Sequence, residues 1–142
     1  MNKVSGAEIV AAYQEAFGMN WWQRFLCLFN GTFRMADPYY READIEVIQE
    51  ILRKDLTDRV KYILHDRDCD DSTFELMGVY HKDERACTYP IFITWVEWYK
   101  DGQRYGHAVI SYYYKGVVYI IEPQSDNIFF PPPDWSLTLL CG

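Results

Sequence analysis

The second half of the chain contains three runs of β-branched and aromatic residues that are separated by short turn signals. The runs cover residues 89–99, 105–114 and 117–122, and the turns are Lys100-Asp101-Gly102 and Lys115-Gly116. Residues of this kind favour pleated strands, and a two-residue turn with glycine favours a tight hairpin. The pattern therefore predicts antiparallel pairing, in which a slip of one residue would move every side chain to the opposite face.

The remaining segments complete the outline of the expected fold. Residues 129–133 are too rich in proline for a central strand, and residues 135–140 are expected to form an edge strand. Four segments before the strands have spacing or end signals typical of helices: residues 7–17, residues 20–29, residues 42–56 and a segment that begins at Cys69 or Asp70. Helices followed by strands predict an α+β fold, with N-terminal helices packed on a C-terminal antiparallel sheet.

Length, charge and cysteine content narrow the class of protein. The 142 residues, 49% of them hydrophobic, suit one domain over residues 1–142, with a helical part at 1–80 and a sheet part at 88–142. The net charge of −7 disfavours nucleic-acid binding, because the phosphate backbone is also negative. Without a signal-peptide pattern or a run of roughly 18 apolar residues, we expect a cytoplasmic protein and no membrane association. The four cysteines form no CxxC pair, which favours free thiols over disulfides or a zinc ribbon.

Three residues typical of thiol catalysis lie at the ends of predicted elements. Cys69 is at the expected start of a helix, His107 opens one strand of a hairpin, and Glu122 ends the next strand. The turn at residues 115–116 brings His107 opposite roughly position 124, so we expect the imidazole and the carboxylate to be neighbours. A helix N-terminus and an imidazolium both lower a cysteine pKa, and a carboxylate orients the imidazole. We therefore expect a nucleophile, a base and an orienting residue, in that order.

Other interpretations of these residues remain open. Cys69 would also suit a small buried position, His107 a hydrogen-bonded strand position, and Glu122 an exposed one. The alternatives for the base and the orienting residue are His65, Gln124 and Asp126.

The surroundings of the thiol raise two further questions. The backbone N–H of Cys69 is expected to donate to an oxyanion, and a second donor is left open among three glutamines, Gln23, Gln49 and Gln124. The negative charges of Asp68, Asp70 and Asp71 would raise the pKa of the Cys69 thiol, unless these carboxylates point away from it, cap the helix or hold a cation. Gln124 and Asp70 are the residues expected to support the site.

Three short runs of the chain resemble known cysteine peptidases. The run Asp68-Cys69-Asp70-Asp71 resembles the nucleophile segment of bacterial transglutaminase-like cysteine peptidases. His107-Ala108-Val109 and Ile121-Glu122-Pro123-Gln124 resemble the histidine and acidic strands of that group and of the papain-like domain fused to a fungal agglutinin lectin. This resemblance covers residues 66–134, about half the chain. It implies a papain-like fold and a triad of Cys69, His107 and Glu122.

The same resemblance also suggests a metal. The agglutinin domain is similar to calcium-dependent proteases, which makes three acidic residues candidate calcium ligands, Asp66, Asp68 and Asp71. The thiol chemistry itself requires no cofactor.

The expected function is hydrolysis of amide bonds in a peptide or protein through an acyl-enzyme, with a peptidase as the first interpretation. A deamidase or a transglutaminase would use the same triad, and a catalytically inactive papain-like interaction module is the alternative from another class. Four aromatic residues could line a groove for an extended peptide, Trp95, Trp98, Tyr112 and Tyr114. The sequence does not indicate an oligomeric state.

Overall fold

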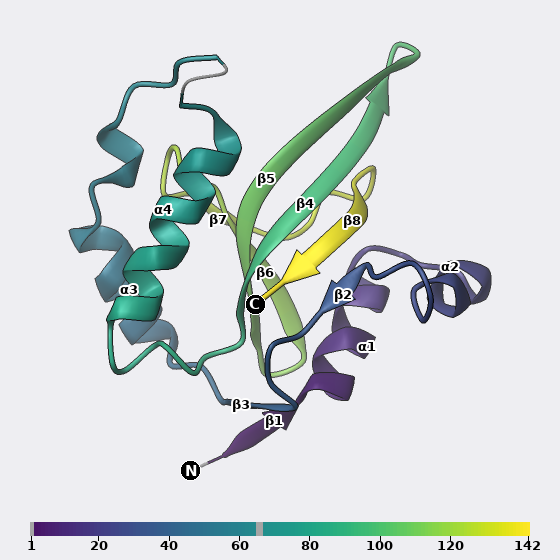
Figure 1. Ribbon diagram of the computed structural model, residues 1–142, viewed down its shortest axis with the longest axis horizontal. Coiled ribbons are helices and arrows are strands. Elements are labelled where there is room, and N and C mark those ends of the chain that lie inside the picture. The colour runs from purple at the N-terminus through teal and green to yellow at the C-terminus, as the bar shows by residue number, and fades with distance from the viewer. Residues whose placement is uncertain (1, 65–66) are drawn as a thin grey trace.

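The structure, a computed structural model, describes residues 2–64 and 67–142 (Figure 1). The helices are α1 (Gly6–Ala16), α2 (Trp21–Leu26), α3 (Ile45–Lys54), the short 3₁₀ helix η1 (Thr57–Arg59) and α4 (Cys69–Lys82). The strands are β1 (Lys3–Ser5), β2 (Phe33–Arg34), β3 (Tyr39–Arg41), β4 (Ile91–Lys100), β5 (Gln103–Tyr114), β6 (Val117–Ile121), β7 (Ile128–Phe129) and β8 (Ser136–Cys141). Within the described part of the chain, none of the helices is both long and apolar enough to cross a membrane.

Two tight hairpins build the centre of the main sheet, as the sequence predicted. Tyr114 pairs with Val117 across the turn, and Lys100 pairs with Gln103. Both central residues of each turn have positive φ, which includes Gly102 at +76° and Gly116 at +86°. That conformation matches the twist of the flanking strands and favours glycine. The predicted register between β5 and β6 is therefore confirmed.

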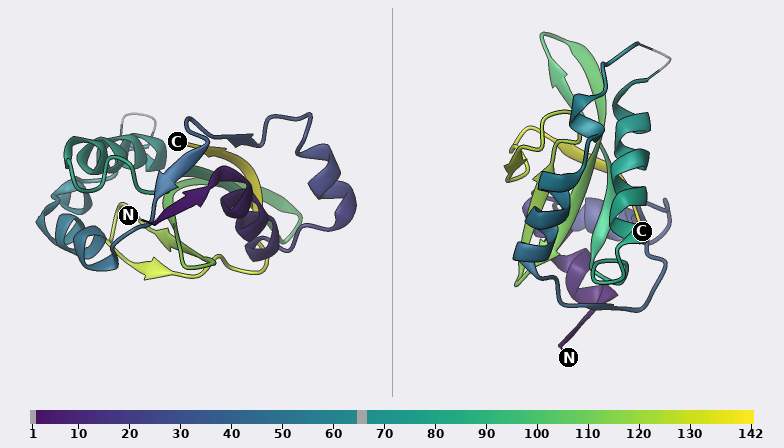
Figure 2. Two further views of the ribbon diagram at one scale, coloured as in Figure 1. Left: turned by 90° about the horizontal axis from the view of Figure 1, so that it is seen from below. Right: turned by 90° about the vertical axis from the view of Figure 1, so that its left-hand side faces the viewer.

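Helices cover both faces of the six-stranded sheet (Figures 1 and 2). Because side chains alternate along a strand, Ile91 and Ile93 of β4 face one way and Phe92 faces the other. Ile91 and Ile93 belong to a core with Leu76 of α4 and with residues of α3. Phe92 belongs to a second core with Tyr13 of α1. The sheet thus separates α3 and α4 from α1.

The expected arrangement of N-terminal helices on a C-terminal, wholly antiparallel, papain-like sheet is wrong. The six-stranded sheet has the order β2-β8-β4-β5-β6-β7, and β2 comes from the N-terminal part of the chain and pairs parallel to β8. A second sheet joins β1 to β3, also from the N-terminal part. The segment at 135–140 is therefore not an edge strand, because β2 covers the outer side of β8. These pairings link residues far apart in the sequence, and no local pattern specifies them.

The predicted helices do form, and α2 and α3 are shorter at both ends than expected. The side chain of Ser5 accepts a hydrogen bond from the N–H of Glu8, so it caps α1 as expected. α3 retains the buried apolar stripe that its spacing predicted, and α4 begins at Cys69. α2 differs, because its aromatic side chains are exposed: Trp21 retains 75% of its accessible surface.

Candidate functional site

The start of α4 positions the Cys69 thiol. Asp68 precedes the helix as its N-cap, and the Asp71 carboxylate accepts the Asp68 backbone N–H at 3.3 Å. The hydroxyl of Thr73 donates to the Cys69 carbonyl at 2.7 Å, which ties the first turn together. The thiol is half-buried at the positive end of the helix macrodipole, where an anion is stabilised. All four cysteines are free thiols.

Strands β5 and β6 bring His107 and Glu122 together. The paired ladder ends at Ile110 and Ile121, and Glu122 follows directly. The Nε2 atom of His107 lies 2.6 Å from a carboxylate oxygen of Glu122. With Nε2 engaged, Nδ1 is the ring nitrogen left for the thiol. The contact expected from the register is present, while the catalytic roles of the residues stay predictions.

The electrostatics of the three groups favour an ion pair between sulfur and imidazole. The contact with His107 is the largest effect on the Cys69 thiol and lowers its pKa, and the N–H of Ala108 lowers it further, against burial and Asp68. Burial alone would lower the pKa of His107, but the contacts with Cys69 and Glu122 outweigh it and raise this pKa to about 9. A lowered thiol pKa and a raised imidazole pKa both favour the thiolate–imidazolium pair over the neutral pair.

Trp135 is a neighbour of the histidine that the sequence reasoning missed. Its ring meets the His107 ring edge-on, with 6.2 Å between centroids, and also contacts Trp98 and Phe129. This aromatic cover limits water access to the bond between His107 and Glu122, whose side chains are 18% and 20% exposed. The segment was predicted to be an edge strand, and nothing local in it indicates contact with a residue so distant in the chain.

The acidic residues around the thiol differ in their contacts. Asp71 caps α4, so the interpretation of that carboxylate as a helix cap is confirmed. Ligand atoms of Asp68, Cys69 and Asp70 lie within 4.8 Å of one another. Asp66, expected with Asp68 and Asp71 to bind calcium, lies outside the described residues. The expected calcium grouping of Asp66, Asp68 and Asp71 therefore stays a prediction.

The other residues that the sequence suggested for the site lie in different environments. The backbone N–H of Gln124 donates to a carboxylate oxygen of Glu122 at 3.3 Å, so Gln124 helps to hold the carboxylate, and its role as an oxyanion donor stays a prediction. The side chain of Gln23 accepts the N–H of Asn20 at the start of α2, away from the thiol. Neither Gln23 nor Gln49 lines the groove beside Cys69. The carboxyl of Asp126 belongs to another environment, where burial and the charges of Asp58 and Asp55 raise its pKa to about 6. The rival base His65 lies outside the described residues.

A groove of about 490 Å³ opens beside the thiol. Its walls include Cys69 and Asp70 from α4 and Glu97 from β4, and Gly106 and His107 contribute from β5. Trp95, one of the aromatic residues expected to line a groove, also lies in it, whereas Tyr112 is fully buried. The thiol therefore faces a space that can hold part of a substrate.

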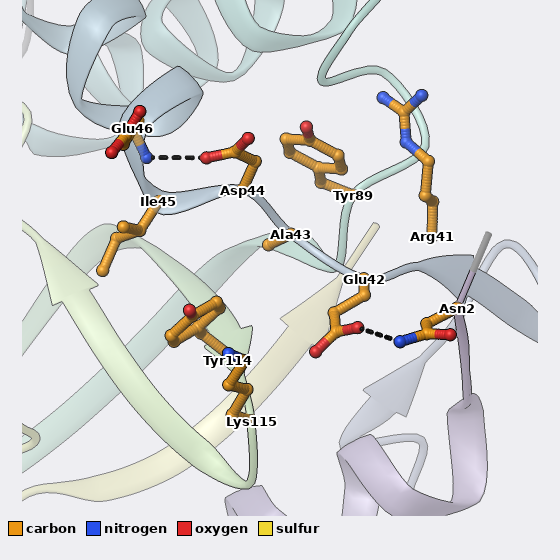
Figure 3. A pocket seen from close by; sticks show the side chains of 10 residues that line it. All are labelled: Asn2, Arg41, Glu42, Ala43, Asp44, Ile45, Glu46, Tyr89, Tyr114 and Lys115. Carbon is orange, nitrogen blue, oxygen red and sulfur yellow. Dashed lines mark hydrogen bonds between the residues drawn. The ribbon is translucent and has the colours of Figure 1, made fainter.

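A second pocket of about 700 Å³ lies at the other end of β5, beside Tyr114 (Figure 3). Some of its polar groups contact one another. The Glu42 carboxylate accepts from the Asn2 amide at 3.0 Å, and the Arg41 guanidinium lies over the Tyr89 ring. This pocket contains no thiol or imidazole, so the groove at Cys69 is the candidate functional site.

Comparisons with known proteins find the fold but no family. No protein-family model matches the chain, and no curated protein matches its sequence. A solved structure described as a PSL1a–E64 complex shares the fold with a TM-score of 0.73 and 14% identity. Polyporus squamosus lectin bound to the human-type influenza-binding epitope Neu5Aca2-6Galb1-4GlcNAc shares it with a TM-score of 0.71 and 14% identity. Each alignment covers 99% of this chain but 51% and 49% of the lectin chains, so the chain spans about half their length.

These comparisons correct the expected family. The motifs predicted a papain-like cysteine peptidase, but the two solved structures named above, which share this fold, are of Polyporus squamosus lectin. The family assignment was wrong because it rested on three short runs around Cys69, His107 and Glu122, which are too brief to identify a family. At 14% identity the likeness shows the fold alone, and what the lectin chains bind remains a property of those chains.

Proposed function

We propose that this chain is a cysteine hydrolase of amide bonds, with Cys69 as nucleophile, His107 as base and Glu122 as the residue that orients the base. The observation that carries the proposal is the joint placement of these groups. A half-buried thiol at a helix start adjoins an imidazole, and that imidazole is bonded at 2.6 Å to a carboxylate. A nucleophile, a base and a third group that orients the base are the requirements of thiol catalysis.

The first half of the proposed reaction transfers an acyl group to sulfur. The Cys69 thiolate attacks the carbonyl carbon, a C–S bond forms, and the carbonyl electrons move to oxygen. The backbone N–H of Cys69, unpaired within α4 because it is in the first turn, is directed to that oxyanion. As the oxyanion collapses, the C–N bond breaks and the His107 imidazolium gives its proton to the leaving amine.

The second half releases the acyl group. Water attacks the thioester carbon while His107 takes a proton from it, and the C–S bond breaks to return thiolate and imidazolium. The product is a carboxylic acid, which ionises in solution. An amine in place of water would give a new amide, which is the transglutaminase version of the same chemistry. Neither version requires a cofactor, and a peptide or protein is the proposed substrate.

Alkylation with iodoacetamide, followed by peptide mass mapping, tests the nucleophile. Cys87 is an exposed thiol in the same chain and serves as the internal comparison. We expect Cys69 to be alkylated faster than Cys87 at about pH 6, because its pKa is lowered and only the thiolate reacts. Equal or slower labelling of Cys69 would refute the proposal and favour a non-catalytic interaction module.

A hydrolysis assay tests the activity itself. Digestion of a peptide mixture, read by mass spectrometry, should show cleavage by the wild-type chain and none by Cys69→Ala. The variant should keep the wild-type melting temperature, since the thiol is at the surface of the groove and not in either core. E64, which one of the solved lectin complexes contains, is a second probe, and a stable mass adduct on Cys69 would support the proposal.

A further inference from the structure

Strand β5 has an uncovered edge next to the thiol. β5 pairs with β4 along most of its length, from Gln103 to Tyr112, but β6 pairs with it only from Ile110 onward. No other described strand lies along residues 103–109. The arm formed by β4 and β5 projects past the end of β6 (Figure 1). Residues 103–106 are exposed, so this edge is open to solvent.

The hairpin turns determine which backbone groups face this edge. Lys100 and Gln103 flank a two-residue turn and therefore exchange hydrogen bonds with each other. The alternation of an antiparallel ladder then directs the N–H and C=O of Arg104, Gly106 and Ala108 outward. The N–H of Ala108 is already used, because it is directed at the Cys69 sulfur and lowers the pKa of that thiol. The groups of Arg104 and Gly106 remain available just beyond the thiol.

We propose that this edge binds an extended peptide as an added strand, with a lysine or arginine side chain in the groove beside Gly106; the inference rests on the proposed hydrolase. A peptide paired with Arg104 and Gly106 would bring its next residues level with Ala108, where the thiol lies. Strand addition supplies affinity through main-chain hydrogen bonds, and the pockets under alternate side chains supply selectivity. Gly106 has no side chain, and only the Val96 carbonyl lies within 4 Å of where a Cβ would be, which leaves room for the peptide.

The charges of the groove favour a cationic side chain. A peptide residue opposite Gly106 points to the face that carries Glu97, since Glu97 is the cross-strand partner of Gly106. Asp70 lines the same groove, with Asp68 adjacent to it. Arg104 is the cation there, and it pairs with Glu97 at a loose 3.7 Å. Among the described residues, no cationic side chain pairs with Asp68 or Asp70.

The opposite face of the added strand meets aromatic residues. Trp98 and Tyr105 are cross-strand partners with stacked rings, 5.6 Å apart. The peptide residue next to the basic one would place its side chain beside them. The preferred substrate is thus an extended segment in which a basic residue alternates with an apolar or aromatic one. Because Gly106 is two residues from Ala108, the basic residue stands two positions from the scissile carbonyl.

The binding test uses Cys69→Ala, which separates binding from turnover. Fluorescence anisotropy would compare labelled peptides that carry Lys, Ala or Glu at the position opposite Gly106, and a Lys peptide with N-methylation at the same residue. We expect the Lys peptide to bind about tenfold more tightly than the Glu peptide, the scale that a pair of partly exposed carboxylates supplies. N-methylation, which removes a main-chain donor, should weaken binding strongly. Equal affinities, or indifference to N-methylation, would overturn the inference.

Variants of the groove complete the design. Glu97→Lys should remove the preference for the Lys peptide, whereas Glu42→Lys, in the pocket at the other end of β5, makes the same change of charge and should retain it. Gly106→Val should block the peptide, with its melting temperature as the check on folding. If this variant unfolds, the N-methylated peptide and Glu97→Lys still decide the matter. Peptide binding without hydrolysis by the wild-type chain would refute the hydrolase alone, and hydrolysis without basic selectivity would refute this inference alone.

Discussion

Replacing Glu122 with glutamine should lower the pKa of His107 from about 9 to roughly 7–8. The variant keeps the size of the side chain and removes its negative charge. The carboxylate is bonded to His107 at 2.6 Å, and both side chains are about four-fifths buried, so solvent screens the charge weakly. A hydrogen bond to a charged group contributes about 1.5–3 kcal/mol, and each pKa unit corresponds to about 1.4 kcal/mol, which gives one to two units.

The direction of the change follows from which state the carboxylate stabilises. Glu122 favours the protonated imidazole, so in the wild-type chain the imidazolium persists until the pH rises through about 9. In Glu122→Gln, burial lowers the pKa of His107 with less opposition, and the imidazolium is lost at a lower pH. A neutral imidazole stabilises the thiolate less, so alkylation of Cys69 should slow relative to the wild-type chain near pH 8, where the variant imidazole has lost its proton and the wild-type imidazole keeps it.

NMR titration of the His107 ring, together with the pH dependence of Cys69 alkylation, measures both effects. Glu97→Gln is the matched control, because Glu97 lines the same groove but pairs with Arg104 instead of the imidazole. The control should leave the pKa of His107 nearly unchanged. A His107 pKa that stays near 9 in Glu122→Gln, or that falls equally in Glu97→Gln, would refute the reasoning.

Three further predictions concern stability, each measured by urea denaturation. The hydroxyl of Ser111 lies 2.6 Å from that of Tyr13 and 2.5 Å from that of Thr94, and all three residues are fully buried. Ser111→Ala should therefore lower the free energy of unfolding by about 1–3 kcal/mol, and no measurable loss would contradict this. The hydroxyl of Tyr112 is buried without a hydrogen-bond partner among the described residues, so Tyr112→Phe should not reduce stability and can increase it. Leu76 is fully buried between α4 and the sheet, and Leu76→Ala should cost about 2–5 kcal/mol; a cost under about 1 kcal/mol would show that the core relaxes around the cavity.

Local elements were predictable from the sequence because local interactions determine them. The Ser5 cap, the start of α4 at Cys69 and the register across Lys115-Gly116 each depend on residues a few positions apart. The register alone was enough to bring His107 near Glu122. A two-residue turn leaves a hairpin with one favoured pairing, and this made the contact predictable.

The long-range arrangement was not predictable in the same way. The parallel pairing of Phe33–Arg34 with β8 and the contact of Trp135 with His107 depend on how distant segments meet. The exposure of Trp21 on α2 contradicts the usual burial of large aromatic residues, which composition alone suggests. The assumption of a papain-like layout failed at these points, since short motifs carry no information about strand order.

Pro123 has two consequences for the candidate site. If the ladder between β5 and β6 continued, residue 123 would be the next to exchange hydrogen bonds with Ala108. An imide nitrogen carries no hydrogen, so that exchange cannot be completed, and β6 ends at Ile121. The N–H of Ala108 is therefore available to the Cys69 sulfur. Glu122 lies outside the strand, so its carboxylate can contact the imidazole of His107. The proline that ends β6 thereby affects both the candidate catalytic groups and the unpaired edge of β5 beside them.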